Sequence, residues 1–248
     1  MAEVILVTGG SRGIGRAVAI LAAERGYDVA INYNSQAEAA EEVARLVRAK
    51  GRKVAVIKAD VGKEEDVVRL FKEVDRQLGR LTALVNNAGI VDKSMRVEAM
   101  SGERLQRMFA TNTVSAFLCA REAIRRMSKR HGGEGGAIVN VSSIAARVGG
   151  PGEFVDYAAS KGALDSFTIG LAKEVGPDGI RVNAVRPGII ETDIHAATGD
   201  PGRVERIAPQ VPLQRAGSAA ETADVILWLL SPQSSYVTGA LVDVSGGR

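Results

Sequence analysis

The stretch that decides the fold is Val4-Ile-Leu-Val-Thr-Gly-Gly-Ser-Arg-Gly-Ile-Gly15. Its first four residues are a continuous apolar run, which is typical of a strand that is covered on both faces of a sheet. The amphipathic segment Ile14 to Arg25 follows at once and predicts a helix. The glycines between the two allow a sharp turn. A strand, a glycine turn and a helix together predict the first unit of a parallel α/β sheet.

The same unit recurs along the chain, because short apolar runs alternate with amphipathic stretches that are long enough for one helix. The apolar runs are Val4 to Val7, Val29 to Ile31, Val54 to Ile57, Ala83 to Val85, Ala137 to Val141, Val182 to Val185 and Leu241 to Val244. The amphipathic stretches are Ile14 to Arg25, Gln36 to Lys50, Lys63 to Leu78, Glu103 to Lys129, Asp156 to Val175 and Ala219 to Leu230. Right-handed crossovers place such helices on both faces of the sheet. We therefore expect a single doubly wound, Rossmann-like α/β domain over residues 1–248, with a parallel sheet of about seven strands.

The composition argues against several other classes of protein. Among 248 residues, 32 Lys and Arg face 29 Asp and Glu, and a net charge of +3 lacks the concentrated basic stripe of a nucleic-acid-binding protein. The densest basic run, Arg121 to Arg130, is typical of a solvated helix face. Cys119 cannot form an internal disulfide, and we expect it in the core; with only two histidines, a zinc site is poorly supplied. No leader and no apolar stretch of about 20 residues is evident, which favours a cytoplasmic protein that does not enter a membrane.

The glycine turn is a candidate site for a pyrophosphate. Gly9, Gly13 and Gly15 let a phosphate approach the backbone, and the helix start offers unpaired amides with a partial positive charge. Ser11 and Ile14 belong to the same predicted loop. The spacing reads GxxxGxG and departs from GxGxxG, so a purely structural turn is an alternative.

The end of the second strand indicates which dinucleotide the turn would take. Folds that prefer NAD(H) place an acid there for the ribose hydroxyls, but this strand ends in Asn32-Tyr-Asn34-Ser with no carboxylate. Arg12 is placed to meet a 2′-phosphate, with Asn34 beside it. A loop arginine can equally point to water, and the missing acid is what favours NADP(H) over NAD(H).

Two further loops follow strands of the predicted sheet. Asp60-Val61 comes after the third strand and could meet the adenine. Asn87, Ala88 and Gly89 come after the fourth, with small residues that let a nucleotide lie against the backbone. Both loops are also ordinary turn sequences. Because ligands of such sheets bind at the carboxyl ends of the strands, the position of the loops favours a binding role.

The motif Tyr157-Ala-Ala-Ser-Lys161 places a phenol and an ammonium on one helix face. A free tyrosine has a pKa near ~10 and shuttles protons poorly at neutral pH, unless a nearby positive charge favours the phenolate. Ser142 and Ser143 end the fifth strand, and a hydroxyl there could steady a carbonyl oxygen, although serines more often cap loops. Asn112, inside the long helical stretch, could hold a bend or a water chain that reaches Lys161.

Together these motifs resemble the short-chain dehydrogenase/reductase family. The matching stretches run over nearly the whole chain and are Thr8 to Gly15, Asn86 to Gly89, Asn112, Ser143, Tyr157 to Lys161 and Arg186 to Thr192. Ser143 and Tyr157 lie 14 positions apart, where relatives commonly show one residue fewer. This favours Ser143 over Ser142 and predicts a reshaped loop from Ile144 to Asp156.

The resemblance implies roles for the residues that match. Tyr157 would be the general acid/base, Lys161 would lower its pKa and bind the nicotinamide ribose, Ser143 would orient the substrate, and Asn112 would support a proton relay. The nicotinamide side would be lined by Pro187, Gly188, Ile190 and Thr192.

The implied activity interconverts a carbonyl (ketone, aldehyde or 3-oxoacyl group) and an alcohol with NADP(H) as the hydride carrier. The substrate remains open. The protein could be a 3-oxoacyl thioester reductase, a glucose 1-dehydrogenase-like enzyme or a general ketone reductase. A non-catalytic NADPH-binding regulator would need no Tyr, Lys and Ser group. A serine hydrolase is disfavoured because Ser143 lacks a GxSxG elbow.

Two further expectations concern the substrate and the assembly. The region of residues 191–215 is expected to close over the substrate, with Asp193, His195, Asp200 and Arg203 as candidate contacts. Relatives are usually homotetramers, which makes Glu103 to Lys129, Asp156 to Val175 and Ala240 to Val244 candidate contacts between subunits.

Overall fold

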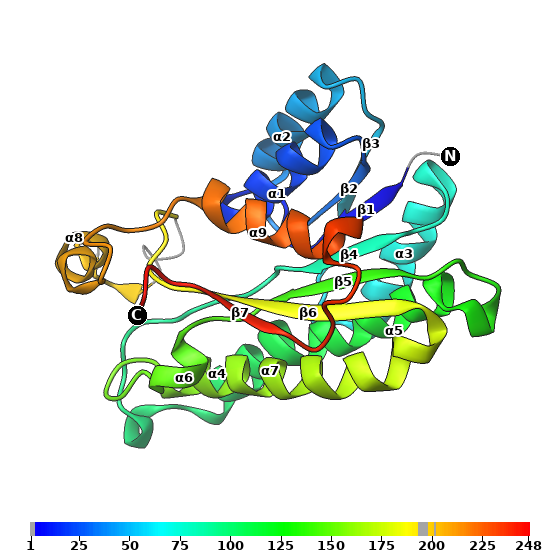
Figure 1. Cartoon of the computed structure of the whole chain (residues 1–248). Helices are drawn as coiled ribbons and strands as arrows, with labels where there is room; N and C mark the ends of the chain where they lie inside the picture. The colour runs from blue at the N-terminus through cyan, green and yellow to red at the C-terminus, as the bar shows by residue number, and fades with distance from the viewer. Residues whose placement is uncertain (1–2, 193–197, 201) are drawn as a thin grey trace.

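The central sheet of the protein is parallel throughout. The computed structural model describes residues 3–192, 198–200 and 202–248, and within them the sheet has seven strands in the order β3-β2-β1-β4-β5-β6-β7 (Figure 1). The strands are β1 (Val4–Val7), β2 (Asp28–Tyr33), β3 (Val54–Lys58), β4 (Ala83–Asn86), β5 (Gly136–Val141), β6 (Ile180–Pro187) and β7 (Leu241–Val244). Each of the seven apolar runs is a strand, so the predicted doubly wound α/β fold is confirmed.

The order of the strands reverses between β1 and β4. The chain moves outward from β1 to β2 and β3, and then returns to place β4 on the other side of β1. Loops that leave β1 and β4 at their carboxyl ends therefore diverge and leave a crevice between them. This switch point is where the glycine turn and the loop after β4 meet.

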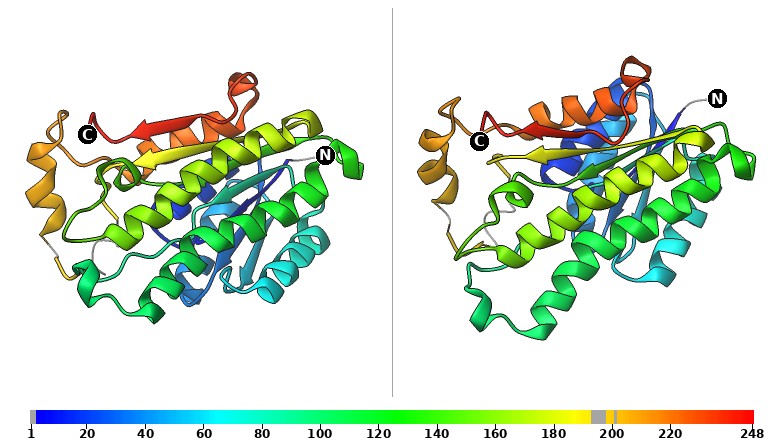
Figure 2. Two further views of the ribbon diagram at one scale, coloured as in Figure 1. Left: turned by 90° about the horizontal axis from the view of Figure 1, so that it is seen from below. Right: turned by 60° about the horizontal axis from the view of Figure 1, so that its bottom comes forward.

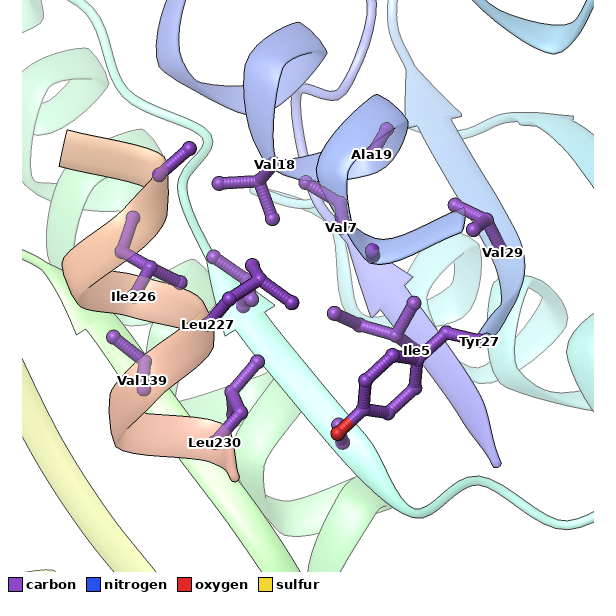
Figure 3. Packing of buried hydrophobic residues seen from close by; sticks show 14 of the residues in the cluster. Ile5, Val7, Val18, Ala19, Tyr27, Val29, Val139, Ile226, Leu227 and Leu230 are labelled. Carbon is purple, nitrogen blue, oxygen red and sulfur yellow. The ribbon is translucent and has the colours of Figure 1, made fainter. Parts of the chain in front are cut away.

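One face of the sheet is covered by α1 (Gly13–Glu24), α2 (Ala37–Ala49) and α9 (Ala219–Leu230) (Figure 1). Val18 of α1 and Leu227 of α9 pack together over the strands, and Figure 3 shows both beside Val7. A capping box starts α9, because Ser218 Oγ accepts from Glu221 N (3.2 Å) and the Glu221 carboxylate accepts from Ser218 N (2.8 Å).

The opposite face is covered by α3 (Glu64–Leu78), α5 (Ser115–Met127) and α7 (Val155–Val175), and Figure 2 shows α7 running alongside the helix that ends as α5. Phe71 and Leu70 are fully buried in this second core. Cys119 is buried there too, as expected, and burial raises the pKa of its thiol to about 12. Its sulfur is therefore an inert core group.

The helix predicted over Glu103 to Lys129 is interrupted. It consists of α4 (Gly102–Phe109), a wide π-helical turn η2 (Ala110–Val114) and α5, followed by the 3₁₀ turn η3 (Lys129–His131). Asn112 lies in the π turn and is buried. A π turn inserts one extra residue per turn and often marks a functional site, so the predicted bend at Asn112 is present.

The basic run Arg121 to Arg130 is only partly the solvated face that we expected. Arg121, Arg125 and Arg126 all bind the buried carboxylate of Glu122, at 3.2, 2.7 and 3.0 Å. Arg126 also binds Asp75 of α3 and is largely buried. The run therefore joins α5 to α3. The predicted solvated position was wrong for Arg126, because its guanidinium binds the buried carboxylate of Glu122.

Short helices lie in the connections between the strands and the longer helices. They are α6 (Ala145–Val148), α8 (Arg203–Ile207) and the 3₁₀ turns η1 (Val97–Ala99), η4 (Gly176–Asp178), η6 (Ala208–Gln210) and η7 (Pro232–Ser234). Helix α8 lies beyond the ends of β6 and β7 (Figure 1). Across the described ranges, no helix has the length and apolar character needed to span a bilayer.

Candidate active site

The glycine turn after β1 is shaped by close backbone contacts. Gly9 and Gly13 have φ of +61° and +53°, a region that side chains disfavour. A Cβ on Gly15 would lie 2.4 Å from the Gly9 carbonyl oxygen and 2.5 Å from Asn87 Nδ2, so this position has no room for a side chain. Ser11 is buried within the turn.

Helix α1 begins at the end of this turn without a side-chain cap. Its N-cap residue Arg12 is extended, and no side chain accepts from the first amides of the helix. The Arg12 guanidinium is exposed and has no hydrogen bond or ion pair with any described residue. Ile14 is half-buried in the first turn. The amides and Arg12 thus offer positive charge at the switch point, which suits a phosphate.

The turn is clamped to the loop after β4. Thr8 Oγ1 accepts from Asn87 N (2.9 Å) and Ala88 N (3.0 Å), and Asn87 Nδ2 donates to the carbonyls of Thr8 (2.9 Å) and Gly9 (3.0 Å). Asn87, which the sequence predicts to contact the cofactor, uses its side-chain amide to join the two loops.

A second clamp comes from Asn32, which sequence reasoning treated only as a missing acid. Its Oδ1 accepts from Gly9 N (3.3 Å) and its Nδ2 donates to Ala59 O (3.0 Å), so it joins the ends of β1, β2 and β3. Asn34 lies just beyond and is exposed. Asp60 Oδ1 accepts from Gly62 N (3.0 Å), which makes Asp60 a turn former at the same edge, with Val61 buried beside it.

Tyr157 and Ser143 face each other at the carboxyl edge of the sheet. Ser143 Oγ accepts from Ala145 N (3.1 Å). Burial raises the pKa of the Tyr157 phenol, and the neighbouring Ser143 side chain partly offsets this. Ser142 turns the other way, because its Oγ donates to the backbone carbonyl of Lys161 in α7 (3.2 Å). The structure thus brings Ser143, and not Ser142, to the tyrosine.

Lys161 lies one turn beyond Tyr157 and is buried. Its Nζ donates to the Val141 carbonyl at the end of β5 (2.8 Å) and lies 5.8 Å from the centre of the Tyr157 ring. A Cβ on Gly89 would lie 3.4 Å from both Lys161 Nζ and Asn112 Oδ1. Gly89 therefore leaves space between the ammonium and the π turn.

Asn112 is held by four contacts in that turn. Its Oδ1 accepts from Ile90 N (2.8 Å), and its Nδ2 donates to Ile90 O (2.9 Å) and Ser160 Oγ (3.1 Å) and contacts Met108 Sδ (3.1 Å). Ser160 lies between Tyr157 and Lys161 in the sequence motif. Asn112 thus joins the loop after β4 to the helix that carries both residues.

The two side chains also differ in what shifts their pKa values. Burial raises the pKa of the Tyr157 phenol, and the Ser143 side chain partly offsets this. The effect of Lys161 on the pKa of Tyr157 stays a prediction. Burial also lowers the pKa of Lys161, to about 8, and this outweighs Asp165, which raises it.

The segment after β6 reaches back to the glycine turn. Pro187 ends β6, Gly188 has no room for a Cβ because it would lie 2.7 Å from Ser245 Cα, and Ile190 is buried. Thr192 packs against Gly13, whose Cβ position is 3.4 Å from the Thr192 methyl carbon.

The expected substrate region begins here. Asp193 and His195 lie outside the described residues. Arg203 of α8 donates to Glu153 (2.7 Å) and covers the Phe154 ring at 4.8 Å, while Asp200 accepts from Arg206. Of the candidate contacts, Arg203 and Asp200 therefore serve interactions within the chain.

A buried ion pair next to Tyr157 is not predicted by the sequence. Arg104 Nε and Nη2 donate to Asp156 at 2.7 and 3.4 Å, both side chains are almost fully buried, and Arg104 Nη1 donates to Lys93 O (2.8 Å). Removing one partner of such a pair generally costs about 3–5 kcal/mol. The pair anchors the first turn of α7 to α4, and no local pattern indicates it because the partners are 52 positions apart.

The fold and this site define a class of protein. A glycine turn at the switch point of a doubly wound sheet is typical of a dinucleotide-binding fold, and Ser143, Tyr157 and Lys161 lie at the same edge of the sheet.

Comparison with known proteins narrows the class. Residues 9–248 match the family model described as "Enoyl-(Acyl carrier protein) reductase". The chain is 54% identical over 245 residues to the uncharacterized oxidoreductase YgfF of Escherichia coli, covering 99% of each chain. It is 38% identical to the 3-oxoacyl-[acyl-carrier-protein] reductase FabG of Staphylococcus aureus, covering 100% of this chain and 98% of that one. A short-chain dehydrogenase from Burkholderia cenocepacia in complex with NADP superposes with a TM-score of 0.91 at 33% identity, over 99% of this chain and 97% of that one.

The chain therefore belongs to the short-chain dehydrogenase/reductase family and is an NAD(P)-dependent oxidoreductase.

Proposed function

We propose that the protein is an NADP(H)-dependent oxidoreductase that interconverts a carbonyl group and an alcohol, with Tyr157 as the general acid/base. The observation that carries the proposal is the buried Lys161 ammonium 5.8 Å from the centre of the Tyr157 ring, with the Ser143 side chain acting on the phenol at the same edge of the sheet. The supporting relative is FabG of S. aureus, whose name specifies a 3-oxoacyl thioester substrate.

In the reductive direction, the side chains manage the oxygen of the substrate. When bound, NADPH supplies the hydride to the carbonyl carbon. The Ser143 hydroxyl donates to the carbonyl oxygen, and Tyr157 transfers its proton to that oxygen as negative charge develops there. Because burial raises the pKa of Tyr157, the phenol is protonated at neutral pH and ready to act as the acid.

Lys161 and Asn112 act behind the phenol. A protonated Lys161 stabilises the phenolate that remains after proton transfer, and with a pKa of about 8 it is mostly charged at neutral pH. Asn112 holds Ile90 and Ser160 in place and keeps the π turn open beside Lys161. These contacts support the proposed proton relay, in which Asn112 takes part beside Lys161.

We assign the dinucleotide to the switch point. Gly9, Ser11, Gly13, Ile14 and Gly15 would hold the pyrophosphate, and Arg12 the 2′-phosphate. The remaining proposed contacts are Asn34, Asp60, Val61, Asn87, Ala88, Gly89, Tyr157, Lys161, Pro187, Gly188, Ile190 and Thr192. The absence of an acid at the end of β2 and the partner-free guanidinium of Arg12 among the described residues support NADP(H) over NAD(H).

The region of residues 191–215 is proposed to cover the substrate. Two contacts hold its described part, because Arg203 binds Glu153 in the loop before α7 and Thr198 O accepts from Ser94 N in the loop after β4 (3.3 Å). A small apolar cluster of Ile189, Ile207 and Val211 supports α8 from below.

The proposed function is tested by turnover with a panel of ketones, aldehydes, 3-oxoacyl thioesters and sugars, read from nicotinamide absorbance. We expect NADPH to be oxidised by at least one carbonyl compound. Sugar-dependent reduction of NADP would favour the glucose 1-dehydrogenase-like alternative. Tight NADPH binding with no turnover on any member would instead favour the regulator.

We further propose a homotetramer, assembled through α5 and α7. Phe117 and Ile169 are exposed on these helices, and Phe117 stacks on Phe167 at 3.7 Å between ring centres, which leaves an apolar surface that spans both. Light scattering after gel filtration should report four times the mass of the chain. A monomer mass at micromolar concentration would contradict this assembly.

A further inference from the structure

A buried carboxylate lies one helical turn beyond Lys161. Asp165 is 8% exposed, and positions four apart on α7 share a face, so its charge and that of Lys161 lie on the same buried side of the helix. The Asp165 side chain faces Ser142, which follows β5, and Arg186 of β6.

From Lys161, charges alternate out to the surface. Arg186 Nη1 contacts Asp165 Oδ2 at 3.4 Å and Arg186 Nε donates to Asp243 Oδ1 at 2.6 Å. Arg147 of α6, which is half exposed, binds the other oxygen of Asp243. The sequence of charges is therefore positive, negative, positive, negative and positive, across four elements of the fold.

Asp165 is poorly paired for a buried acid. Its Oδ1 is buried and has no hydrogen-bond partner among the described residues, and its one ion pair is long. The Arg104 and Asp156 pair near the start of α7 shows the alternative, with two bonds and a contact of 2.7 Å. Because an under-paired buried charge is costly, structural bracing alone accounts poorly for Asp165.

We propose that Asp165 is a positioning residue that sets the protonation of Lys161, and that Arg186 moderates its effect. The effect of Asp165 on catalysis rests on the proposed function, because only there does a charged Lys161 stabilise the phenolate. Its effect on the protonation of Lys161 does not. Lys161 faces the Tyr157 phenol and Asp165 on its own helix, the Val141 carbonyl on β5, and Gly89 and Asn112 Oδ1 from the loop after β4 and the π turn. Of the described residues, Asp165 is the acid that raises the pKa of Lys161 against burial.

The sign of each substitution follows from Coulomb's law. Asp165→Asn removes a negative charge from beside the ammonium, so the pKa of Lys161 should fall. Arg186→Met removes a positive charge and leaves Asp165 less compensated, so the pKa of Lys161 should rise. Nearby charges commonly move a buried pKa by about 1–3 pH units, and we expect at least about one pH unit for Asp165→Asn.

The test is a lysine ¹³Cε NMR titration of the full chain, with the Lys161 signal assigned by its loss in Lys161→Met. Asp28→Asn is the matched control, because Asp28 is also buried and paired with an arginine (Arg52, 2.8 Å) but lies at the amino edge of the sheet. It should destabilise the protein without moving the Lys161 titration. Asp165→Glu keeps the charge and should titrate close to the unmodified chain.

An unmoved Lys161 midpoint in Asp165→Asn, or shifts of the same sign in Asp165→Asn and Arg186→Met, would overturn the inference. If Asp165→Asn does not fold, Arg186→Met and Asp165→Glu decide it. The titration does not depend on turnover. An inactive protein that shows the expected shifts would therefore contradict the proposed function and still support this inference.

Discussion

Replacing Tyr157 with Phe is expected to lower turnover by roughly 10²–10⁴-fold, the usual contribution of a positioned general acid. The substitution removes the proton that the carbonyl oxygen receives and leaves the ring, which packs half-buried above Lys161. NADPH binding should stay nearly intact, because the glycine turn and its clamps do not involve the phenol oxygen. Steady-state kinetics with an active carbonyl substrate and fluorescence titration with NADPH measure the two effects separately.

The matched control for this substitution is Tyr27→Phe. Tyr27 is buried and burial raises the pKa of its phenol to about 12, as burial also raises that of Tyr157, but Tyr27 lies between α1 and β2 at the amino edge of the sheet. Its loss should leave turnover close to that of the unmodified protein. Near-normal turnover in Tyr157→Phe would refute the assignment of the general acid, whatever the control does.

Replacing Arg12 with Glu should raise the KM for NADPH by about ten to a hundredfold and change the KM for NADH far less. A charge-assisted hydrogen bond is worth about 1.5–3 kcal/mol, and each 1.4 kcal/mol is about tenfold in affinity. The exposed guanidinium makes no competing contact within the described chain, so its loss costs little stability. Parallel KM determinations with both dinucleotides provide the ratio that matters.

Arg80→Glu is the matched control for Arg12→Glu. Arg80 is exposed in the loop between α3 and β4, at the opposite edge of the sheet, and its substitution changes the net charge equally. If Arg80→Glu shifts the ratio of the two KM values as much as Arg12→Glu does, the effect is a general field effect and Arg12 has no specific role in choosing NADP(H).

Local pattern was enough to predict the strands and the turn chemistry. A strand covered on both faces reads as a continuous apolar run, and all seven runs are strands. The glycine turn could also be predicted locally, since Gly9 and Gly13 have positive φ values that glycine adopts without strain. The motif from Tyr157 to Lys161 predicted a shared helix face because the helical period places positions four apart together.

Contacts between distant positions could not be predicted in this way. Asn32 was noted only for lacking a charge, yet it joins three strand ends. Arg104 and Asp156 form an ion pair next to Tyr157, although they lie 52 positions apart in the sequence. The sequence predicted only a bend at Asn112. The π turn depends on contacts with the loop after β4, where Ile90 N donates to Asn112 Oδ1, and these contacts join positions that are distant in the sequence.

The sequence by itself determined the doubly wound sheet and the position of the glycine turn, and it placed Tyr157 and Lys161 on one helix face, because periodicity and turn preference are properties of neighbouring residues. Only the tertiary structure decided how those residues are charged. The pKa of Lys161 and of Tyr157 depends on burial and on groups such as Ser143 and Asp165. Desolvation and Coulomb energies are set by distances in space, and separation along the chain does not reveal them.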